Sequence, residues 1–347
     1  MFLVRAWYNK AAWLHTLRPL AWLFRRLSAW RRVHLTRQQI APGLPVVVIG
    51  NITVGGTGKT PVVVAVARAL TKQGLRVGVL SRGYGGSAGR YPYEVETHSA
   101  VTETGDEARL LRRHLTGPLI LDPDRRRGLE ALAAQGNCDV VISDDGLQHY
   151  RLWRDVEVVM VDGARGLGNG LCLPAGPLRE PPARLQEADF VVINGSEQPL
   201  RQEQLPGVPV SHCELAPVAW VNIRSRERVS LTQLAQALGV DPAPDGRIRH
   251  DAQGRPVLAI AGIGNPQRFF DSLDAGGIDA QCQAFADHHP YQPDDLLHAS
   301  DRVLLMTEKD AVKCERFASD DWWYLEVQAQ LDPAMLQDLC NQVAALR

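Results

Sequence analysis

Short apolar runs that end in glycine or polar residues recur along the chain. The run Val46–Ile49 is followed by the glycine-rich stretch Gly50–Gly58, and a helical pattern then covers Pro61–Leu70. The next apolar run is Leu75–Leu80. A strand, a helix and a second strand in this order predict two parallel strands joined by a crossover helix.

More apolar runs of the same kind occur beyond residue 100. They are Val140–Ser143, Val156–Val161 and Phe190–Asn194. Parallel strands are buried on both faces of a sheet and therefore need continuous apolar runs. We expect a doubly wound α/β domain built on a parallel sheet.

A second, smaller α/β unit is predicted to begin near residue 256, after a polar and proline-containing stretch at 195–225 that suggests a domain junction. Its predicted strands are Val257–Ala261, Val303–Met306 and Trp322–Val327. The expected organisation is a basic amphipathic segment at 1–40, a phosphate-binding (P-loop) domain at 41–215 and a second α/β domain at 216–347.

Composition agrees with a globular protein of two domains. With 347 residues and 45% hydrophobic content, the chain can build two cores of ordinary size. Its six cysteines are scattered without any C-x-x-C pair, which argues against a disulfide framework or a zinc site. A reducing, intracellular compartment is the expected location.

The formal net charge of −1 hides a strong asymmetry. Residues 1–93 contain fourteen Lys or Arg and no Asp or Glu, so the remainder carries −15. The basic part begins with a tryptophan-rich segment in which Leu3, Trp7, Leu14 and Leu17 share one helical face. No apolar run approaches the roughly 20 residues that span a bilayer. Such a helix can lie in the headgroup layer of an anionic membrane, and packing on its own domain is the alternative.

The stretch Gly50–Thr60 has the chemistry of a phosphate-binding loop. Small residues let successive backbone N–H groups curl around an anion, and the helix that follows points its positive end toward that anion. Lys59 is placed to reach the outer phosphates, and Thr60 is placed to hold Mg²⁺. Because Thr53 replaces the first glycine of the usual pattern, a flexible turn is the alternative. The residues predicted to bind the nucleotide are Thr53, Val54, Gly55, Gly56, Thr57, Gly58, Lys59 and Thr60.

Two adjacent acids, Asp144 and Asp145, follow the apolar run that starts at Val140. The carboxyl ends of parallel strands meet at one edge of a sheet, so a carboxylate there can reach a Mg²⁺ held by Thr60. Neighbouring strand residues point to opposite sides, so the two acids are expected to have different roles. A solvated turn at the strand end is the alternative.

Three other stretches carry weaker signals. Gly262-Ile263-Gly264 follows a predicted strand, but Arg268 stands where a dinucleotide fingerprint has its third glycine, so a tight turn is favoured. Asp287-His288-His289 could suggest a metal site, yet three consecutive residues cannot readily chelate one ion from a strand or helix. Thr307–Asp310 lacks the spacing of a guanine-recognition motif.

Together these motifs resemble those of the tetraacyldisaccharide 4′-kinases, which phosphorylate the disaccharide precursor of lipid A at the inner membrane. The likeness keeps one order along much of the chain, which is more specific than any single motif. The matching stretches are Gly50–Pro61, Ser81–Gly85, Thr104–Glu107, Asp144–His149, Leu173–Pro181, Asp287–His289 and Thr307–Lys313.

The resemblance implies a two-lobed α/β kinase that uses ATP and Mg²⁺. It also implies monotopic association with the cytoplasmic face of the inner membrane of a Gram-negative bacterium. An Asp assisted by a His activates the acceptor in this family, and by position these are Asp106 and His288, which join Lys59 in the expected catalytic set. Without the family, Asp106 could simply begin a helix, and His288 could be a packed loop residue.

The expected reaction is transfer of the ATP γ-phosphate to the 4′-hydroxyl of a tetraacyldisaccharide 1-phosphate. Arg82, Arg125 and Arg179 are candidates for contact with phosphates or the lipid headgroup, and surface salt bridges are an equal alternative for each. A membrane-recruited ATPase without lipid transfer and a nucleotide-binding scaffold without turnover are the other hypotheses. The expected partners are the lipid and an anionic membrane surface, with no nucleic acid and no obligate protein partner.

Overall fold

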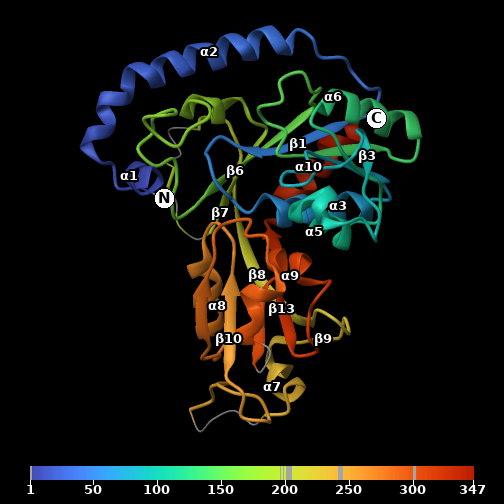
Figure 1. Ribbon diagram of the computed structural model, residues 1–347. Helices are drawn as coiled ribbons and strands as arrows, with labels where there is room; N and C mark the ends of the chain where they lie inside the picture. Colours follow the sequence, from blue (N-terminus) through green and yellow to red (C-terminus); the bar gives the residue numbers. More distant parts are fainter. Residues whose placement is uncertain (1, 196, 198, 201–204, 241–244, 300–301) are drawn as a thin grey trace.

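The computed structural model describes residues 2–195, 197, 199–200, 205–240, 245–299 and 302–347. These residues form two lobes that lie one above the other in Figure 1, with both ends of the chain in the upper, first lobe. Of the polar stretch at 195–225, residues 196, 198 and 201–204 lie outside the described residues.

Parallel strands form the centre of the first lobe. Its strands are β1 (Val46–Asn51), β2 (Val77–Ser81), β3 (Tyr93–Glu94), β4 (Leu119–Leu121), β5 (Val140–Asp144), β6 (Val156–Asp162) and β7 (Phe190–Asn194). β1 lies between β5 and β6, and only the short edge strand β3 pairs antiparallel among these described strands. Every residue of β1, β2 and β5 is buried, which confirms the predicted parallel sheet.

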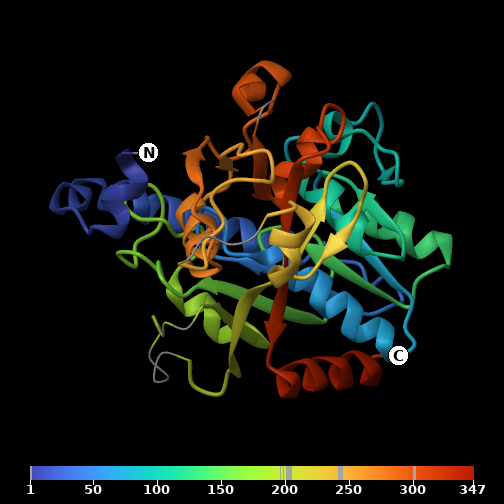
Figure 2. The same ribbon diagram turned by 90° about the horizontal axis from the view of Figure 1, so that it is seen from below.

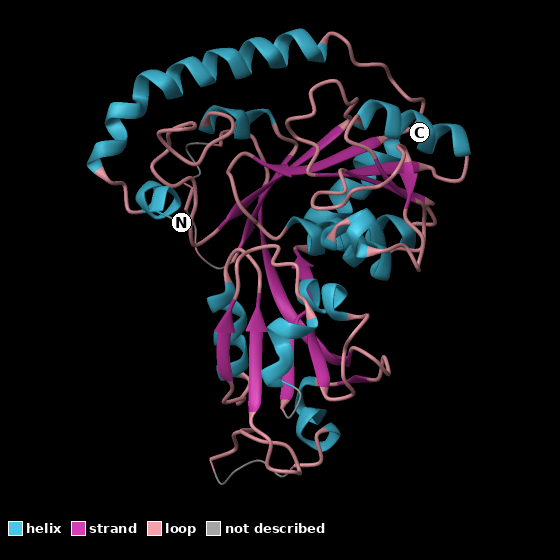
Figure 3. Cartoon of the chain, in the orientation of Figure 1, coloured by secondary structure: helices cyan, strands magenta, loops and turns pink. Residues whose placement is uncertain are grey.

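Helices cover both faces of this sheet (Figure 3). They are α3 (Lys59–Lys72), α4 (Val101–Thr104), α5 (Asp106–His114), α6 (Arg125–Gln135) and α10 (Pro333–Ala345), with the 3-10 turn η2 (Pro182–Glu187). α3, α5 and α10 share a core with Val47 and Ile49, whereas α6 shares one with Val46 and Val48. Alternate residues of one strand thus enter two cores, as the pleat of a strand requires.

The second lobe is a smaller α/β unit, as predicted. Its strands are β9 (Arg228–Val229), β10 (Val257–Ala261), β11 (Gln281–Ala284) and β12 (Val303–Thr307), and β8 (Val210–Asn222) and β13 (Trp322–Leu331) reach it from the first lobe. Its helices are α7 (Leu234–Ala237), α8 (Pro266–Ala275) and α9 (Glu308–Cys314), with 3-10 turns η4 (Leu231–Gln233) and η5 (Pro293–Ala299).

The long strands β8 and β13 join the lobes. They pair antiparallel from Cys213 opposite Leu331 to Asn222 opposite Trp323, and Pro217 lies opposite Val327 where the register shifts. Proline lacks the N–H that a ladder needs, so an irregularity is expected there. One sheet therefore runs through both lobes in the order β11-β10-β12-β13-β8-β7-β6-β1-β5-β2-β4-β3, with β9 beside β8.

The second lobe is an insertion in the first. The chain leaves along β8 and returns along β13 directly into α10 (Figure 2). Met335, Leu339 and Val343 of α10 then pack in the core of the first lobe. The boundary predicted between residues 215 and 216 falls inside β8, and the division into domains at 41–215 and 216–347 stays a prediction.

The N-terminal segment contains α1 (Phe2–Tyr8), the 3-10 turn η1 (Ala12–Leu17) and α2 (Arg18–Thr36). Trp7 and Leu14 are buried against Val54 and Leu173, and the Trp7 indole N–H donates to the Pro174 carbonyl (3.0 Å). α2 arches over the first lobe on the side away from the second lobe (Figure 1). In the described part of the chain, no helix is long and apolar enough to cross a bilayer.

Candidate active site

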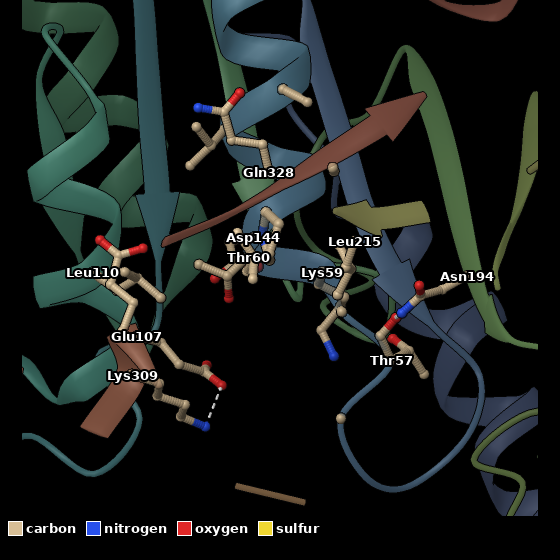
Figure 4. A pocket seen from close by; sticks show the side chains of 18 of the residues that line it. Thr57, Lys59, Thr60, Glu107, Leu110, Asp144, Asn194, Leu215, Lys309 and Gln328 are labelled. Atoms are coloured by element: carbon tan, nitrogen blue, oxygen red, sulfur yellow. Dashed lines mark hydrogen bonds and ion pairs between the residues drawn. The ribbon is translucent and has the colours of Figure 1, made fainter. Parts of the chain in front are cut away.

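A cleft of about 980 Å³ lies between the lobes, beyond the carboxyl ends of β1 and β5. The first lobe lines it with the phosphate loop and the acids that follow β5, and the second lobe lines it with residues that follow β10, β11 and β12. In Figure 4, Lys59, Thr60 and Asp144 project into this space together with Glu107 and Lys309. Ligands of open α/β sheets bind at this edge.

Glycines shape the phosphate loop where no other residue fits. Gly55 and Gly58 have φ angles of +100° and +81°, which favour glycine. A Cβ at Gly58 would lie 2.5 Å from Nδ2 of Asn194. That amide nitrogen donates to the Thr57 carbonyl (3.0 Å), so β7 holds the loop from the side. Gly58 caps α3, and the N-terminus of the helix therefore opens onto the loop.

The beginning of the loop closes without a glycine. Thr53 is buried and has no positive φ. The Thr53 carbonyl accepts a hydrogen bond from Nδ2 of Asn51 (2.9 Å), and the Val54 N–H donates to the Pro177 carbonyl (2.9 Å). The departure from the usual pattern at Thr53 therefore costs the loop no strain.

Lys59 and Thr60 begin α3 and line the cleft. Nζ of Lys59 lies 3.2 Å from Oδ1 of Asn51 and 3.3 Å from Oδ1 of Asp145. The ammonium is thus held between the loop and the acid pair, where the outer phosphates of a bound nucleotide would meet it.

The two acids after β5 have different surroundings. Asp144 is buried, and burial together with the charges of Glu107 and Asp145 raises its pKa above the usual range. Burial also acts on Asp145, but the charges of Lys59 and Arg179 outweigh it and lower the pKa of Asp145. The Asp144 carboxyl thus accepts a hydrogen bond from the Ser81 hydroxyl (3.3 Å), whereas the Asp145 carboxyl is neutralised by the nearby Lys59 and Arg179.

The structure brings Asp106 and His288 together although 182 positions separate them. Nδ1 of His288 lies 2.9 Å from Oδ2 of Asp106, which begins α5 at the cleft. Burial raises the pKa of Asp106, but the hydrogen bond to His288 and the charge of Lys309 outweigh this, so the pKa lies below its usual value. The same hydrogen bond raises the pKa of His288.

Two of the predicted site residues have strained backbones. Asp145 and His288 have φ angles of +51° and +60°, in the left-handed region. Such conformations cost on the order of 1 kcal/mol and persist where surrounding contacts enforce them, which is common at active sites. The strain places both side chains toward the cleft that they line.

The three arginines predicted to contact substrate differ in exposure. Arg82 is exposed at the cleft, and Nη1 of Arg179 lies 3.7 Å from Oδ2 of Asp145. Arg125 is almost fully buried, with Nη1 donating to the Asp122 carbonyl and Nη2 to the Asp144 carbonyl, each at 3.0 Å. Arg125 therefore ties the carboxyl end of β5, at Asp144, to Asp122.

Sequence reasoning did not assign roles to Lys309 and Asn194, which also line the cleft. Lys309 contacts Glu107 and His288, and Asn194 holds the phosphate loop. The only sequence signal for Lys309 is its place in the matching stretch Thr307–Lys313.

The weaker sequence signals have structural explanations. Gly262-Ile263-Gly264 forms the turn between β10 and α8, and Nη1 of Arg268 lies 3.3 Å from Oδ1 of Asn194. His288 is directed to Asp106, whereas Nε2 of His289 lies 3.1 Å from Oδ2 of Asp295. The two histidines thus contact different carboxylates, His288 that of Asp106 and His289 that of Asp295.

Comparisons with known proteins agree with this site. Residues 13–344 match the family described as Tetraacyldisaccharide-1-P 4′-kinase. The chain is 45% identical to a tetraacyldisaccharide 4′-kinase of Pseudomonas putida, covering 99% of this chain and 97% of the relative. It is also 45% identical to that of Pseudomonas aeruginosa, covering 96% of this chain and 94% of the relative.

A crystal structure of LpxK from Aquifex aeolicus in complex with ATP has the same fold. The TM-score is 0.72 at 24% identity, with 96% of this chain and 99% of that chain covered. The fold, the arrangement of the cleft and the match over nearly the whole sequence lead to one conclusion. The chain belongs to the tetraacyldisaccharide 4′-kinase family.

Proposed function

We propose that this protein transfers the γ-phosphate of ATP to the 4′-hydroxyl of a tetraacyldisaccharide 1-phosphate. The observation that carries the proposal is the Asp106–His288 pair, because His288 lines the same cleft as the phosphate loop and lies 2.9 Å from the Asp106 carboxylate. Membership of the kinase family favours this reaction over a membrane-recruited ATPase without lipid transfer.

ATP is proposed to bind at residues 53–60, and Mg²⁺ at Thr60, Asp144 and Asp145. Oδ1 of Asp144 is buried without a hydrogen-bond partner, which fits a hard cation that prefers oxygen ligands. Proteins often hold Mg²⁺ through one or two carboxylates and the substrate phosphates, so a larger ligand cluster is not required. When bound, Mg²⁺ supplies neutralisation of the charge on the transferred phosphoryl group.

Asp106 is the proposed base. Its carboxylate takes the hydroxyl proton while the hydroxyl oxygen forms the new bond to phosphorus and the bond between that phosphorus and the ADP oxygen breaks. His288 donates a hydrogen bond that orients the carboxylate. Lys59 neutralises the phosphates, and Arg82, Arg125 and Arg179, which all line the cleft, are the arginines proposed to contact substrate phosphate or headgroup.

The proposed reaction predicts that incubation with ATP and purified tetraacyldisaccharide 1-phosphate yields a phosphorylated lipid and ADP in equal amounts. Mass spectrometry of the lipid and a coupled ADP assay measure the two products. Release of inorganic phosphate without change in the lipid would instead support the ATPase, and no turnover would support the scaffold.

We further propose that residues 1–40 associate with the anionic cytoplasmic face of the inner membrane through α2. Leu20, Leu23, Leu27 and Trp30 recur at helical spacing and are 48–67% exposed. No acid occurs in this segment, and five arginines of α2 can meet lipid phosphates. The buried side of α2 includes Ala21, so the apolar row faces away from the protein.

Replacing Leu23, Leu27 and Trp30 together by Gln should weaken adsorption to anionic vesicles by about 100-fold. Partial burial of these side chains in the interface contributes roughly 3 kcal/mol. Vesicle co-sedimentation measures adsorption, which for the unchanged protein should fall as salt rises.

The matched control is Leu231→Gln, which removes an exposed leucine of the second lobe. It should leave adsorption unchanged, and both variants should keep ATP binding. Equal adsorption of the triple variant and the unchanged protein would show that α2 does not meet the membrane.

A further inference from the structure

A second cavity, of about 630 Å³, lies between α2 and the turn η2. Among the described residues, it has no lining residue in common with the interlobe cleft, although Arg179 lines the cleft and Glu180 lines this cavity. The two cavities are therefore neighbours with a wall between them. The α2 cavity, as we name it, is lined by charged side chains and one small side chain, including Arg25, Ala29, Arg32, Arg37, Glu180 and Arg184.

The α2 cavity lies under the face of α2 opposite its exposed apolar row. At about 100° per residue, Arg25, Ala29 and Arg32 cluster on one side of the helix, and the row of Leu23 and Leu27 lies roughly opposite. A helix with side chains is about 10–12 Å across, and an interfacial helix sinks its apolar face about 5–10 Å into the boundary of headgroups and acyl chains. With the apolar row in the membrane, the cavity lies at the level of the lipid headgroups.

The floor of the α2 cavity is charged but close to neutral. Glu180 and Arg184 are buried there, and Nε of Arg184 lies 3.4 Å from Oε2 of Glu180. Nη2 of Arg184 donates to Oε1 of Glu157 (2.6 Å), which also accepts from Nη1 of Arg154 (2.8 Å). Two arginines thus face two glutamates. Nη1 of Arg184 has no hydrogen-bond partner among the described residues, so the floor keeps an unused donor without excess charge.

The excess positive charge lies at the rim. Arg32 is neutralised by Glu187, with 3.1 Å between Nη1 and Oε1. Arg25 and Arg37 are exposed, and neither pairs with a carboxylate in the part of the chain that the structure describes. Two cations therefore remain for an anion, and the carboxylates of Glu180 and Glu187 can accept hydroxyl protons of the same ligand. A zwitterionic headgroup would add a cation to this excess, whereas an anionic polyol phosphate neutralises it.

We propose that the α2 cavity binds the headgroup of one anionic phospholipid. The phosphodiester meets the arginines of the rim, the headgroup hydroxyls meet Glu180 and Glu187, and the acyl chains stay in the bilayer beside α2. This inference goes beyond the proposed kinase reaction. It deepens the proposed membrane association of residues 1–40, on which it rests, because it adds a saturable site to a general attraction between charges.

The test is a calorimetric titration of the full chain with dihexanoylphosphatidylglycerol below the concentration at which this lipid forms micelles. Saturable binding of one lipid per chain is expected. The double variant Arg25→Gln with Arg37→Gln should bind about 10-fold more weakly or worse, because charge-assisted hydrogen bonds to the phosphate are lost. Ala29→Trp keeps every charge but fills the cavity, and it should abolish saturable binding.

The matched control is the double variant Arg18→Gln with Arg26→Gln. It removes the same charge from two exposed arginines of α2 that do not line the cavity. At about 0.15 M salt, exposed charges more than about 8 Å apart are largely screened, so the affinity should change less than about twofold. Dihexanoylphosphatidylcholine and inorganic phosphate are the control ligands, and each should bind at least about 10-fold more weakly than the anionic lipid.

Equal losses in the two double variants, or saturable binding by a folded Ala29→Trp, would overturn the proposal. Binding of phosphatidylcholine or inorganic phosphate as tight as that of the anionic lipid would overturn it as well. Thermal unfolding identifies variants that fail to fold, and the arginine variants decide the matter if Ala29→Trp is one of them.

The same variants separate a phospholipid site from a substrate site. In detergent micelles without phospholipid, Ala29→Trp should change the KM for tetraacyldisaccharide 1-phosphate less than about twofold. A clear rise in this KM would assign the cavity to the substrate and overturn the proposal. The titration itself contains no ATP, substrate or vesicles, so its failure is distinct from failure of the proposed reaction or of vesicle adsorption.

Discussion

Lys59→Ala is expected to lower lipid phosphorylation by several orders of magnitude while the protein stays folded. The ammonium lies between Asn51 and Asp145 at the start of α3, and its side chain is 14% exposed. Without it, Asp145 keeps the more distant cation of Arg179 (3.7 Å), but the outer phosphates lose the ammonium that would neutralise the charge developing during transfer. Steady-state kinetics with saturating ATP and lipid measure the loss.

The control for this variant is Arg90→Ala. Arg90 is an exposed cation that does not line the cleft, so its loss should leave turnover close to that of the unchanged protein. Circular dichroism and thermal unfolding check that both variants fold. Near-normal turnover of Lys59→Ala would remove the phosphate loop from the proposed reaction.

Asp106→Asn is expected to lower kcat by about 10²-fold or more. The amide keeps the shape of the carboxyl and still meets His288, but it cannot take the hydroxyl proton. The KM values for ATP and lipid should change little, because the change affects the step in which the proton moves. Full activity in this variant would rule out Asp106 as the base and direct attention to Glu107 or Asp145.

The pairing of Asp106 with His288 predicts how the effects of the two substitutions combine. His288→Ala should lower the same kcat, and the double variant should be scarcely slower than the slower single variant, because residues that act as one unit are not additive. Losses that multiply would show that the two residues act separately, with His288 then contacting phosphate.

The strands that were predicted from sequence share one property. The runs at 46–49, 140–143, 156–161 and 190–194 are apolar except for Ser143, Glu157 and Asn194, because both faces of the sheet are covered. Because these strands are buried on both sides, they have no solvent-facing row of polar residues to interrupt the apolar run. The glycine-rich loop between β1 and α3 also marks in the sequence where β1 ends.

β8 was missed for the opposite reason. It bridges two lobes, so its burial is alternating at 210–214, intermediate at 215–218 and complete at 219–222, and it contains Pro217 at a register shift. Such a composition is typical of a linker. The very short β3 and β4 were missed because two or three residues show no period.

The chemistry of the site was predictable only where it follows a strand directly. The strands β1 and β5 are parallel neighbours in the sheet. The residues that follow them, Lys59 and Thr60 after β1 and Asp144 and Asp145 at the end of β5, therefore lie at one edge of the sheet. Lys309 meets Asp106 and Glu107 only because the second lobe folds back over the first. No local sequence pattern predicts the contact of Lys309 with Asp106 and Glu107. Only the resemblance to the kinase motifs pointed to the stretch Thr307–Lys313.

Because the chain returns to the first lobe along β13, a variant without the second lobe can be designed. Since β8 and β13 are antiparallel neighbours, a tight hairpin turn near Ala219 and Glu326 could replace everything between them without rerouting α10. Such a minimal variant would retain the glycine loop and the acids of β5 but would lack both His288 and Lys309. The topology thus keeps the phosphate loop, the acids of β5 and Asp106 in the first lobe and places His288 and Lys309 in the inserted second lobe.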